Sequence, residues 1–308
     1  MITPGYVGID ISKQFLDLFD DSLGTAERCP NTPQAIAGLV ARWHTRDLFV
    51  LFEATGAYDR NLRQALAAAG IRFSAVNPAR ARDFARATGR LAKTDSLDAR
   101  MLAAMARALQ PQPQAPHLPE RETLARLNRR RDQLVDCRKR ERTRREAETD
   151  TDLLVDLDLH IAFLDARIAA VEARIRALLN TPALATPLRL LRSIPGVGPV
   201  AAAVLLARMP ELGTTTPKAA AALAGLAPFN VDSGTFRGKR SIRGGRNRVR
   251  QALYMAAVTA SRCHPRFKNA YQALRAAGKP PKLALVAIAR RIVVTANALL
   301  RDNVTFQT

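Results

Sequence analysis

Two acidic residues interrupt the apolar runs of the N-terminal part. Asp10 lies between Ile9 and Ile11 at the end of the β-rich run at residues 6–11, and Glu53 closes the continuous apolar run at residues 48–52. An acid in such a place costs free energy unless it is paired or binds a cation. If the two runs form adjacent parallel strands, both carboxylates lie at the same edge of a sheet. The pattern therefore predicts a cation site at that edge.

A second pair of acids lies on a predicted helix at residues 95–109. Asp95 and Asp98 are three positions apart, so they project from one face of that helix. With Asp10 and Glu53 they supply four hard oxygen ligands, which suit a pair of Mg²⁺ ions that stabilise both oxygens in phosphodiester cleavage. Simpler roles stay open, with Asp95 as a helix N-cap and Glu53 as the partner of an arginine.

A serine beside a glycine precedes a strongly basic stretch in the second half of the chain. This serine, Ser233, lies in Asp-Ser-Gly-Thr-Phe-Arg-Gly at 232–238 and could attack a phosphodiester to form a phosphoserine link. An ordinary loop serine is the competing interpretation, and composition alone favours it. Residues 236–250 contain no acid and seven cations: Arg237, Lys239, Arg240, Arg243, Arg246, Arg248 and Arg250.

Two further segments have the chemistry of phosphate binding. Ile-Pro-Gly-Val-Gly at 194–198 is typical of the hairpin in a helix-hairpin-helix, where Gly196 and Gly198 would let backbone N–H groups approach a phosphate. A plain turn between two helices is the alternative. A basic stretch also precedes the helix that begins at Asp95, and we expect its cations to bind nucleic acid: Arg80, Arg82, Arg86, Arg90 and Lys93.

Alternating strands and helices are expected to position the four carboxylates. The apolar patterns predict strands at 6–11, 14–19, 26–29, 48–52 and 71–76, and helices at 33–43, 59–69 and 95–109. The order β-β-β-α-β-α-β-α is that of a ribonuclease-H-like domain, so the fold class predicted for residues 1–115 is α/β.

The rest of the chain is predicted to be helical. Apolar residues from Leu157 to Leu178 step by four and three in an unbroken heptad pattern. Two antiparallel helices, or a longer coiled coil shared between subunits, fit this pattern equally well. We therefore predict a coiled-coil segment at 116–182 and a mostly helical C-terminal domain at 183–308, with helices at 199–209, 246–263 and 282–300.

Composition indicates a polyanionic partner. The chain of 308 residues has 48 Lys and Arg against 27 Asp and Glu, a formal net charge of +21, and a pI near 11.2. On a globular chain this balance is the footprint of nucleic acid binding. The longest apolar stretches are about half the length that crosses a bilayer, so we expect a soluble protein with no membrane partner.

Several short motifs together resemble a known family. They are Tyr-Val-Gly-Ile-Asp at 6–10, Phe-Glu-Ala-Thr-Gly at 52–56, Val-Asn-Pro at 76–78, Lys-Thr-Asp-Ser-Leu-Asp-Ala-Arg at 93–100, Ile-Pro-Gly-Val-Gly at 194–198, and Ser-Gly-Thr at 233–235 followed by Arg-Gln-Ala-Leu-Tyr-Met at 250–255. In this order they resemble the insertion sequence 110 family of transposases, which is related to the Piv DNA invertases. The resemblance covers nearly the whole chain.

The resemblance implies a RuvC-like domain with an Asp-Glu-Asp-Asp tetrad, a coiled coil, and a C-terminal transposase domain with a catalytic serine. By motif match the tetrad falls on Asp10, Glu53, Asp95 and Asp98, with Mg²⁺ as cofactor, and the serine is Ser233. Members act as oligomers, here expected to be a dimer or tetramer, with a structured non-coding RNA called a bridge RNA that pairs with donor and target DNA. Thr-Phe after Ser-Gly departs from the pattern, in which smaller polar residues are frequent.

The expected function is therefore that of a DNA transposase or recombinase, in the bacterial cytoplasm and with the nucleoid when bound to DNA. A junction resolvase that uses the same tetrad without a covalent intermediate is the first alternative, and it leaves the Ser233 segment without a role. An actin-like sugar kinase would need a glycine-rich phosphate loop after Asp10, where Ile-Ser-Lys follows. A packaging protein explains the charge but not the acids in apolar strands.

Overall fold

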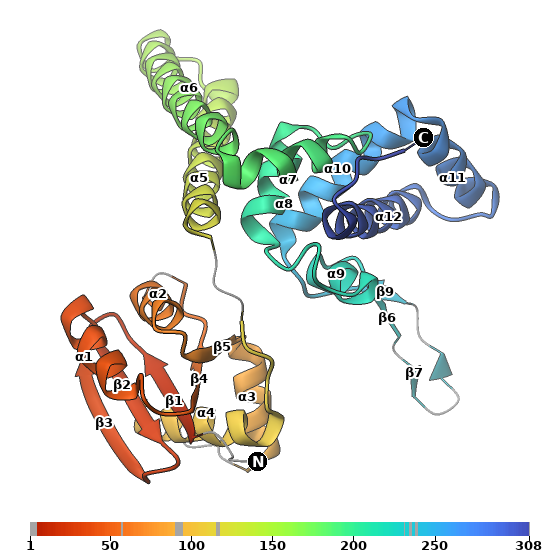
Figure 1. The fold of residues 1–308 in the computed structure, drawn as a ribbon. Coiled ribbons are helices and arrows are strands. Elements are labelled where there is room, and N and C mark those ends of the chain that lie inside the picture. The colour runs from red at the N-terminus through yellow and green to blue at the C-terminus, as the bar shows by residue number, and fades with distance from the viewer. Residues whose placement is uncertain are drawn as a thin grey trace. The chain divides into compact units, whose positions relative to one another are not determined.

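The structure, a computed structural model, describes residues 5–56, 58–89, 95–114, 118–230, 232–233, 236–237 and 240–307; for 95–97, 232–233 and 236–237 it describes only the backbone. The chain forms two compact units, Met1–Pro116 and His117–Thr308, and Figure 1 shows the elements of each. The first unit is mixed α/β and the second is mostly helical. The predicted boundaries at 115 and 182 stay a prediction.

A five-stranded mixed sheet forms the centre of the first unit. Its strands are β1 (Gly5–Ile11), β2 (Phe15–Asp20), β3 (Thr25–Pro30), β4 (Leu48–Glu53) and β5 (Arg72–Val76), in the order β3-β2-β1-β4-β5. β2 is antiparallel to β1 and to β3, whereas β4 is parallel to β1 and to β5. Each strand lies within one residue of its predicted bounds, and the continuous apolar run of β4 is buried as expected.

Helices cover both faces of this sheet. Side chains that alternate along β1 belong to two different cores. Val7 and Ile9 share a core with α1 (Pro33–Trp43) and α2 (Arg60–Ala68). Tyr6 shares the other core with α3 (Pro78–Ala87) and α4 (Asp95–Leu109). Asp10 follows the alternation of Tyr6, so it lies on the face that α4 covers.

The helix α3 was not predicted from the sequence, which was interpreted there only as a basic stretch. Its start has clear signals: Asn77 accepts a hydrogen bond from the Ala79 N–H at 2.8 Å, and Pro78 occupies the first helical position. Only Ala81 of this helix is buried. A single buried position produces no apolar periodicity, which explains why the pattern did not reveal the helix.

Two long helices, α5 (Pro119–Ala147) and α6 (Thr151–Leu179), form an antiparallel hairpin at the start of the second unit. Its core contains the predicted heptad residues from Ile161 to Ile175, all buried. One chain thus forms the two antiparallel helices that the sequence allowed. Ion pairs connect the helices at steps of seven residues that rise along α5 and fall along α6: Arg131–Glu172, Arg138–Asp165 and Arg145–Asp158.

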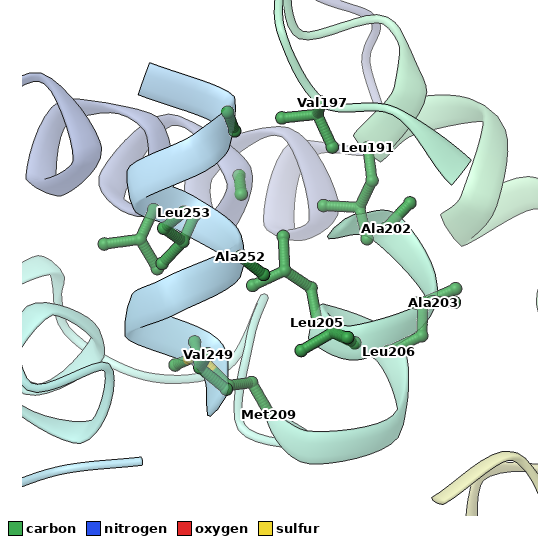
Figure 2. Packing of buried hydrophobic residues seen from close by; sticks show 14 of the residues in the cluster. Leu191, Val197, Ala202, Ala203, Leu205, Leu206, Met209, Val249, Ala252 and Leu253 are labelled. Carbon is green, nitrogen blue, oxygen red and sulfur yellow. The ribbon is translucent and has the colours of Figure 1, made fainter. Parts of the chain in front are cut away.

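Further helices pack around the base of this hairpin in one core, which extends from Leu124 to Leu299. Figure 2 shows part of it, where Leu205 points toward Ala252 and Met209 lies beside Val249. The helices are α7 (Pro182–Arg192), α8 (Pro199–Arg208), α9 (Pro217–Leu223), α10 (Asn247–Cys263), α11 (Pro265–Ala276) and α12 (Pro281–Asp302). The sequence predicted α8, α10 and α12 to within two residues and did not predict α7, α9 or α11.

Among the described residues, α12 is the one helix long and apolar enough to cross a membrane by length and composition. No such segment was expected from the sequence, because its longest apolar stretches are about half the length that crosses a bilayer. Ile288, Ile292 and Val293 of α12 are fully buried in the core of the second unit. Burial within a globular core is sufficient to explain the apolar composition of this helix.

Candidate active site and nucleic-acid interface

Asp10 and Glu53 lie at the ends of two adjacent parallel strands, Asp10 one residue before the last of β1 and Glu53 the last of β4, in matching register. Ile9 of β1 lies opposite Phe52 of β4, and each acid is the next residue along its strand. Residues opposite one another in a sheet point to the same face, so the two side chains emerge side by side. Both are half-buried, and Asp10 Oδ1 accepts a hydrogen bond from the Ile11 N–H at 3.0 Å. The sheet therefore brings together the two acids that the sequence analysis paired.

The helix that carries Asp98 lies directly against β1 on the same face. Gly8 makes this possible, because a Cβ at that position would lie 2.0 Å from the carbonyl oxygen of Ala99 and 2.4 Å from the amide nitrogen of Ala103. Asp98 directly precedes Ala99 and is half-buried. Asp95 begins the same helix, and its side chain lies outside the described residues.

A further carboxylate, which the sequence analysis missed, lies on this face. Asp17 of β2 is the register partner of Asp10, and Arg28 of β3 is the register partner of Asp17. The Arg28 guanidinium donates two hydrogen bonds to the Asp17 carboxylate, at 2.8 and 3.0 Å. Asp17 is thus neutralised within the sheet. The gap of only two residues between the strands predicted at 6–11 and 14–19 was the signal for a hairpin, although it does not fix the register that pairs these two residues.

The chemistry of these side chains fits a hard divalent cation, which prefers carboxylate oxygens. Among the described side chains, no three His, Cys, Asp or Glu residues lie close enough together to hold a metal ion. The predicted ligand set includes Asp95, whose side chain is not among them. The assignment of all four ligands therefore stays a prediction.

Ser233 belongs to a short β-hairpin. It ends β7 (Asp232–Ser233), which pairs with β8 (Phe236–Arg237) so that Ser233 lies opposite Phe236. A second short pair, β6 (Pro228–Phe229) with β9 (Ser241–Ile242), forms the base of this excursion. The sequence favoured a loop here. The side chains of Ser233 and Arg237, and the whole of Lys239, are not among the residues that the structure describes.

Two of the cations predicted to bind nucleic acid form ion pairs within the second unit. Arg246 donates two hydrogen bonds to Glu211, at 2.7 and 2.5 Å. Arg248 donates two to Asp132 of α5, at 2.8 and 2.9 Å. These pairs fix the start of α10 to its surroundings, so both arginines have a structural role.

The other predicted cations differ in their surroundings. Arg240 is exposed, and the Arg243 guanidinium lies 5.6 Å from the ring centre of Phe229. Neither has an acidic partner among the described side chains. Arg86 lies 3.9 Å from Asp83 at the exposed surface of α3, where an ion pair adds little stability. Arg90 and Lys93 fall outside the described residues.

The glycine turn at 194–198 connects α7 to α8 and is held against α10. Gly196 has a φ of +84°, and a Cβ there would lie 2.3 Å from the carbonyl oxygen of Ala256. Only glycine meets both conditions. Gly198 is the exposed N-cap of α8, and no described side chain caps this helix. The first N–H groups of α8 are therefore available to an anion.

Comparisons with known proteins match both units. A family model described as a transposase, of the IS110 DEDD type, matches residues 7–147, and a model of the IS116/IS110/IS902 transposase family matches residues 188–272. The pilin gene-inverting proteins of Moraxella lacunata and Moraxella bovis are each 30% identical over 98% of this chain and 97% of their own. An IS110 protein of Streptomyces coelicolor is 38% identical over 45% of the chain and 34% of its own length.

These matches run through the α/β unit that carries the strand-end acids and through the basic helical unit that follows. The protein is therefore a DNA recombinase, an enzyme that acts on DNA. It belongs to the IS116/IS110/IS902 family of transposases. The resemblance inferred from the sequence motifs is confirmed.

Proposed function

We propose that the chain cleaves and rejoins DNA strands through a RuvC-like domain in which Asp10, Glu53, Asp95 and Asp98 hold Mg²⁺. The observation that carries this proposal is the register of β1 and β4, which places Asp10 beside Glu53. The sheet supports the ribonuclease-H-like assignment, because its first three strands pair as antiparallel neighbours and β4 and β5 then run parallel to β1. A bound divalent ion would stabilise the negative charge on the attacking and leaving oxygens.

The protein's own residues prepare such a site. Asp10 and Glu53 are half-buried like charges on neighbouring strands, and such charges repel one another unless a cation lies between them. The close contact of α4 with Gly8 fixes the helix that presents Asp98. The carboxylates are thus held on rigid elements, as a preorganised site requires.

Substitution of Asp10 tests the metal site. Asp10→Asn removes one charge with little change of shape, and we expect it to abolish recombination in Mg²⁺ without changing the circular dichroism spectrum. MgCl₂ should raise the melting temperature of the native protein but not that of Asp10→Asn. Asp47→Asn is the matched control, because Asp47 is an exposed acid of the same unit that pairs with Arg72. Full activity of Asp10→Asn in Mg²⁺ would show that the assignment is wrong.

We assign the nucleophile to Ser233. Its oxygen would attack a DNA phosphorus atom, forming a serine–phosphate ester while the bond to one strand-end oxygen breaks and that oxygen takes up a proton. Transfer of the phosphate to a new strand end would reverse the step and release the serine. Ser233 has no His or Lys beside it in the sequence, and serine is a weak nucleophile without activation. The carboxylate site is the proposed source of that activation.

Trapping a covalent protein–DNA adduct distinguishes this mechanism from that of a junction resolvase. End-labelled substrate DNA is incubated with the protein in Mg²⁺, denatured, and analysed by gel electrophoresis for protein-linked label. We expect an adduct with the native protein and none with Ser233→Ala. Ser241→Ala is the control, because Ser241 is an exposed serine of the same basic segment. An adduct that persists in Ser233→Ala would overturn the serine, and a nuclease without any adduct would support the resolvase.

We propose a structured guide RNA as a second polyanionic partner. The formal net charge of +21 supports this, as does the distribution of charge, since residues 233–301 contain 16 cations and no acid. Each phosphate that these cations neutralise releases a counterion from the nucleic acid, so binding should weaken steeply with salt. Sequencing the RNA that co-purifies with the protein tests the proposal. Recombination at full rate after ribonuclease treatment would exclude a guide role.

We further propose a homo-oligomer, a dimer or tetramer. Large apolar side chains are exposed on α6 at Val155, Leu159 and Phe163, and Leu159 is 68% exposed. Their spacing of four residues forms a stripe along the helix, and large exposed apolar patches mark interaction surfaces. Light scattering of the native protein and of Leu159→Ser tests this. A native protein that is a monomer at every concentration would contradict it.

A further inference from the structure

A groove of about 790 Å³ opens on the second unit where three segments meet. They are the start of α8 at residues 198–201, the exposed side of α10, and the first turns of α12. Val200 and Met255 line the groove, and both are unusually exposed for large apolar residues, at 42% and 61%. Two independent helices therefore present apolar side chains to the same open space, which marks a binding surface.

The polar residues of the groove have one sign of charge. Its lining contains Arg248, Arg250 and Lys282, and no acid. Arg248 is already paired with Asp132, whereas Arg250 donates to the Gly244 carbonyl oxygen and so keeps its full positive charge. This combination of apolar walls and cations fits a partner that carries both flat apolar surface and negative charge.

Groups capable of hydrogen bonding complete the lining. Tyr254 presents an aromatic ring with a hydroxyl, and Gln251 and Thr259, both exposed, present an amide and a hydroxyl. An apolar protein segment would offer nothing to the cations or to these hydrogen-bonding groups. A nucleotide can interact with each kind of group, because its base has a π-face and polar edges and its phosphate is an anion.

We propose that this groove binds unpaired nucleotides of single-stranded DNA, with bases against Tyr254 and Met255 and phosphates near Lys282. A duplex stacks its bases inside and offers only backbone and groove edges, so it cannot use the apolar walls. An enzyme that exchanges DNA strands handles unpaired DNA during its reaction. The inference rests on the DNA strand exchange proposed above, and Gly196 and Gly198, which the sequence predicted to approach phosphates, lie at the same groove.

Binding is measured by fluorescence anisotropy with a labelled oligothymidine, without divalent ions and with the full-length protein. Stacking of one base contributes on the order of 1–3 kcal/mol, so Tyr254→Ala should weaken binding by about tenfold. Met255→Gln should weaken binding as well. Because Met255 is exposed, this substitution should leave the fold unchanged. Leu283→Gln, a similarly exposed position outside the lining, is the apolar control.

Two more comparisons locate the contact. Lys282→Ala should lower affinity more than Lys268→Ala, which removes the same charge from exposed α11 outside the groove. An oligonucleotide that carries 5-iododeoxyuridine should crosslink on irradiation to the α10 peptide that contains Tyr254 and Met255. Crosslinks confined to other peptides would overturn the proposal.

Specificity decides the identity of the occupant. The groove variants should leave the affinity for a duplex of the same length unchanged. An equal loss for duplex and single strand would overturn the proposal, as would a stronger effect on oligouridine, which would identify RNA as the occupant. Asp10→Asn and Ser233→Ala should bind oligothymidine like the native protein. Normal binding by Met255→Gln and Tyr254→Ala would thus refute the groove and leave the proposed cleavage chemistry intact.

Discussion

Gly8 of β1 and Ala99 of α4 are in contact so close that no side chain fits between them. A Cβ at Gly8 would lie 2.0 Å from the Ala99 carbonyl oxygen. Gly8 lies two residues before Asp10, and Ala99 directly follows Asp98. The contact thus sets how close the helix that carries one predicted metal ligand lies to the strand that carries another. A glycine that looks structural is therefore a positioning residue for the candidate active site.

Gly8→Ala should destabilise the protein and reduce recombination. The new methyl group meets backbone atoms, which cannot rotate away, so α4 must move. Overpacking of a core costs about 1–3 kcal/mol or more, and urea unfolding followed by circular dichroism measures this loss. Gly38→Ala is the control, because Gly38 lies exposed in α1 with open space around it. There alanine should stabilise the helix by roughly 0.5–1 kcal/mol, and a Gly8→Ala protein as stable as the native one would contradict the close contact.

The stability of the protein should depend on the ionisation of Asp20. This carboxylate is buried, which raises its pKa, but hydrogen bonds from Arg46 and Ser22 more than offset burial, so the pKa of Asp20 is lower than its ordinary value. The Arg46 guanidinium nitrogen Nη1 lies 2.7 Å from Asp20 Oδ2, and the Ser22 hydroxyl oxygen lies 2.6 Å from Asp20 Oδ1. A carboxyl with a lowered pKa stabilises the fold above its unfolded pKa, and that contribution is lost as the pH falls through the folded pKa.

Asp20→Asn should therefore lower the free energy of unfolding at neutral pH by about 1.5–3 kcal/mol, as expected for hydrogen bonds to a charged group. The difference from the native protein should shrink as the pH falls below about 4. Urea unfolding at a series of pH values measures both effects. Asp47→Asn, at an exposed ion pair, should change stability by less than about 1 kcal/mol. A difference between native and Asp20→Asn that is constant with pH would refute the linkage.

Apolar packing should stabilise the α5–α6 hairpin more than its ion pairs do. Arg138 and Asp165 pair at the surface, with side chains 26% and 42% exposed. Arg138→Ala should therefore lower the free energy of unfolding by less than about 1 kcal/mol. Leu164 is buried in the seam, and Leu164→Ala should cost roughly 2–5 kcal/mol. Urea unfolding of both variants tests the order. A larger loss for Arg138→Ala would show that the ion pairs hold the helices together.

Most of the fold could be predicted because its elements have strong periodic signals. Strand β4 is a continuous apolar run, and α6 has an unbroken heptad pattern. The helix α3 was missed because a single buried alanine leaves no period to detect. Helix α11 was missed for a similar reason, since Phe267 is its one buried residue. Elements that bury many side chains therefore have an apolar pattern that can be detected in the sequence, whereas surface helices that bury one residue do not.

The candidate site was predicted only as far as local sequence determines it. Asp10 and Glu53 could be paired because each ends an apolar run, which fixes its place at a strand end. The pairing of Asp17 with Asp10 depends on the register of a hairpin, which no single residue encodes. The bonds from Arg248 to Asp132 join residues 116 apart in the chain. Tertiary packing alone decides whether such an arginine faces an internal acid or a phosphate.

The last prediction concerns how Ser233 reaches the carboxylate site. The two sites belong to different units of the chain, and Ser233 follows Asp98 by 135 residues. Given the oligomer proposed from the exposed stripe on α6, one subunit's serine can act with another subunit's carboxylates. We therefore expect that Asp10→Asn and Ser233→Ala proteins, each inactive alone, recover part of the activity when mixed.

The adduct identifies the arrangement directly when the two proteins carry tags of different size. In a composite site the DNA should be linked to the Asp10→Asn subunit, which keeps its serine, while the Ser233→Ala subunit supplies intact carboxylates. A mixture of Asp10→Asn with Glu53→Gln is the control and should stay inactive, because every carboxylate site in it is damaged. If mixed oligomers of the first pair form but yield neither adduct nor recombination, each serine acts with the carboxylates of its own chain, and the composite site is wrong.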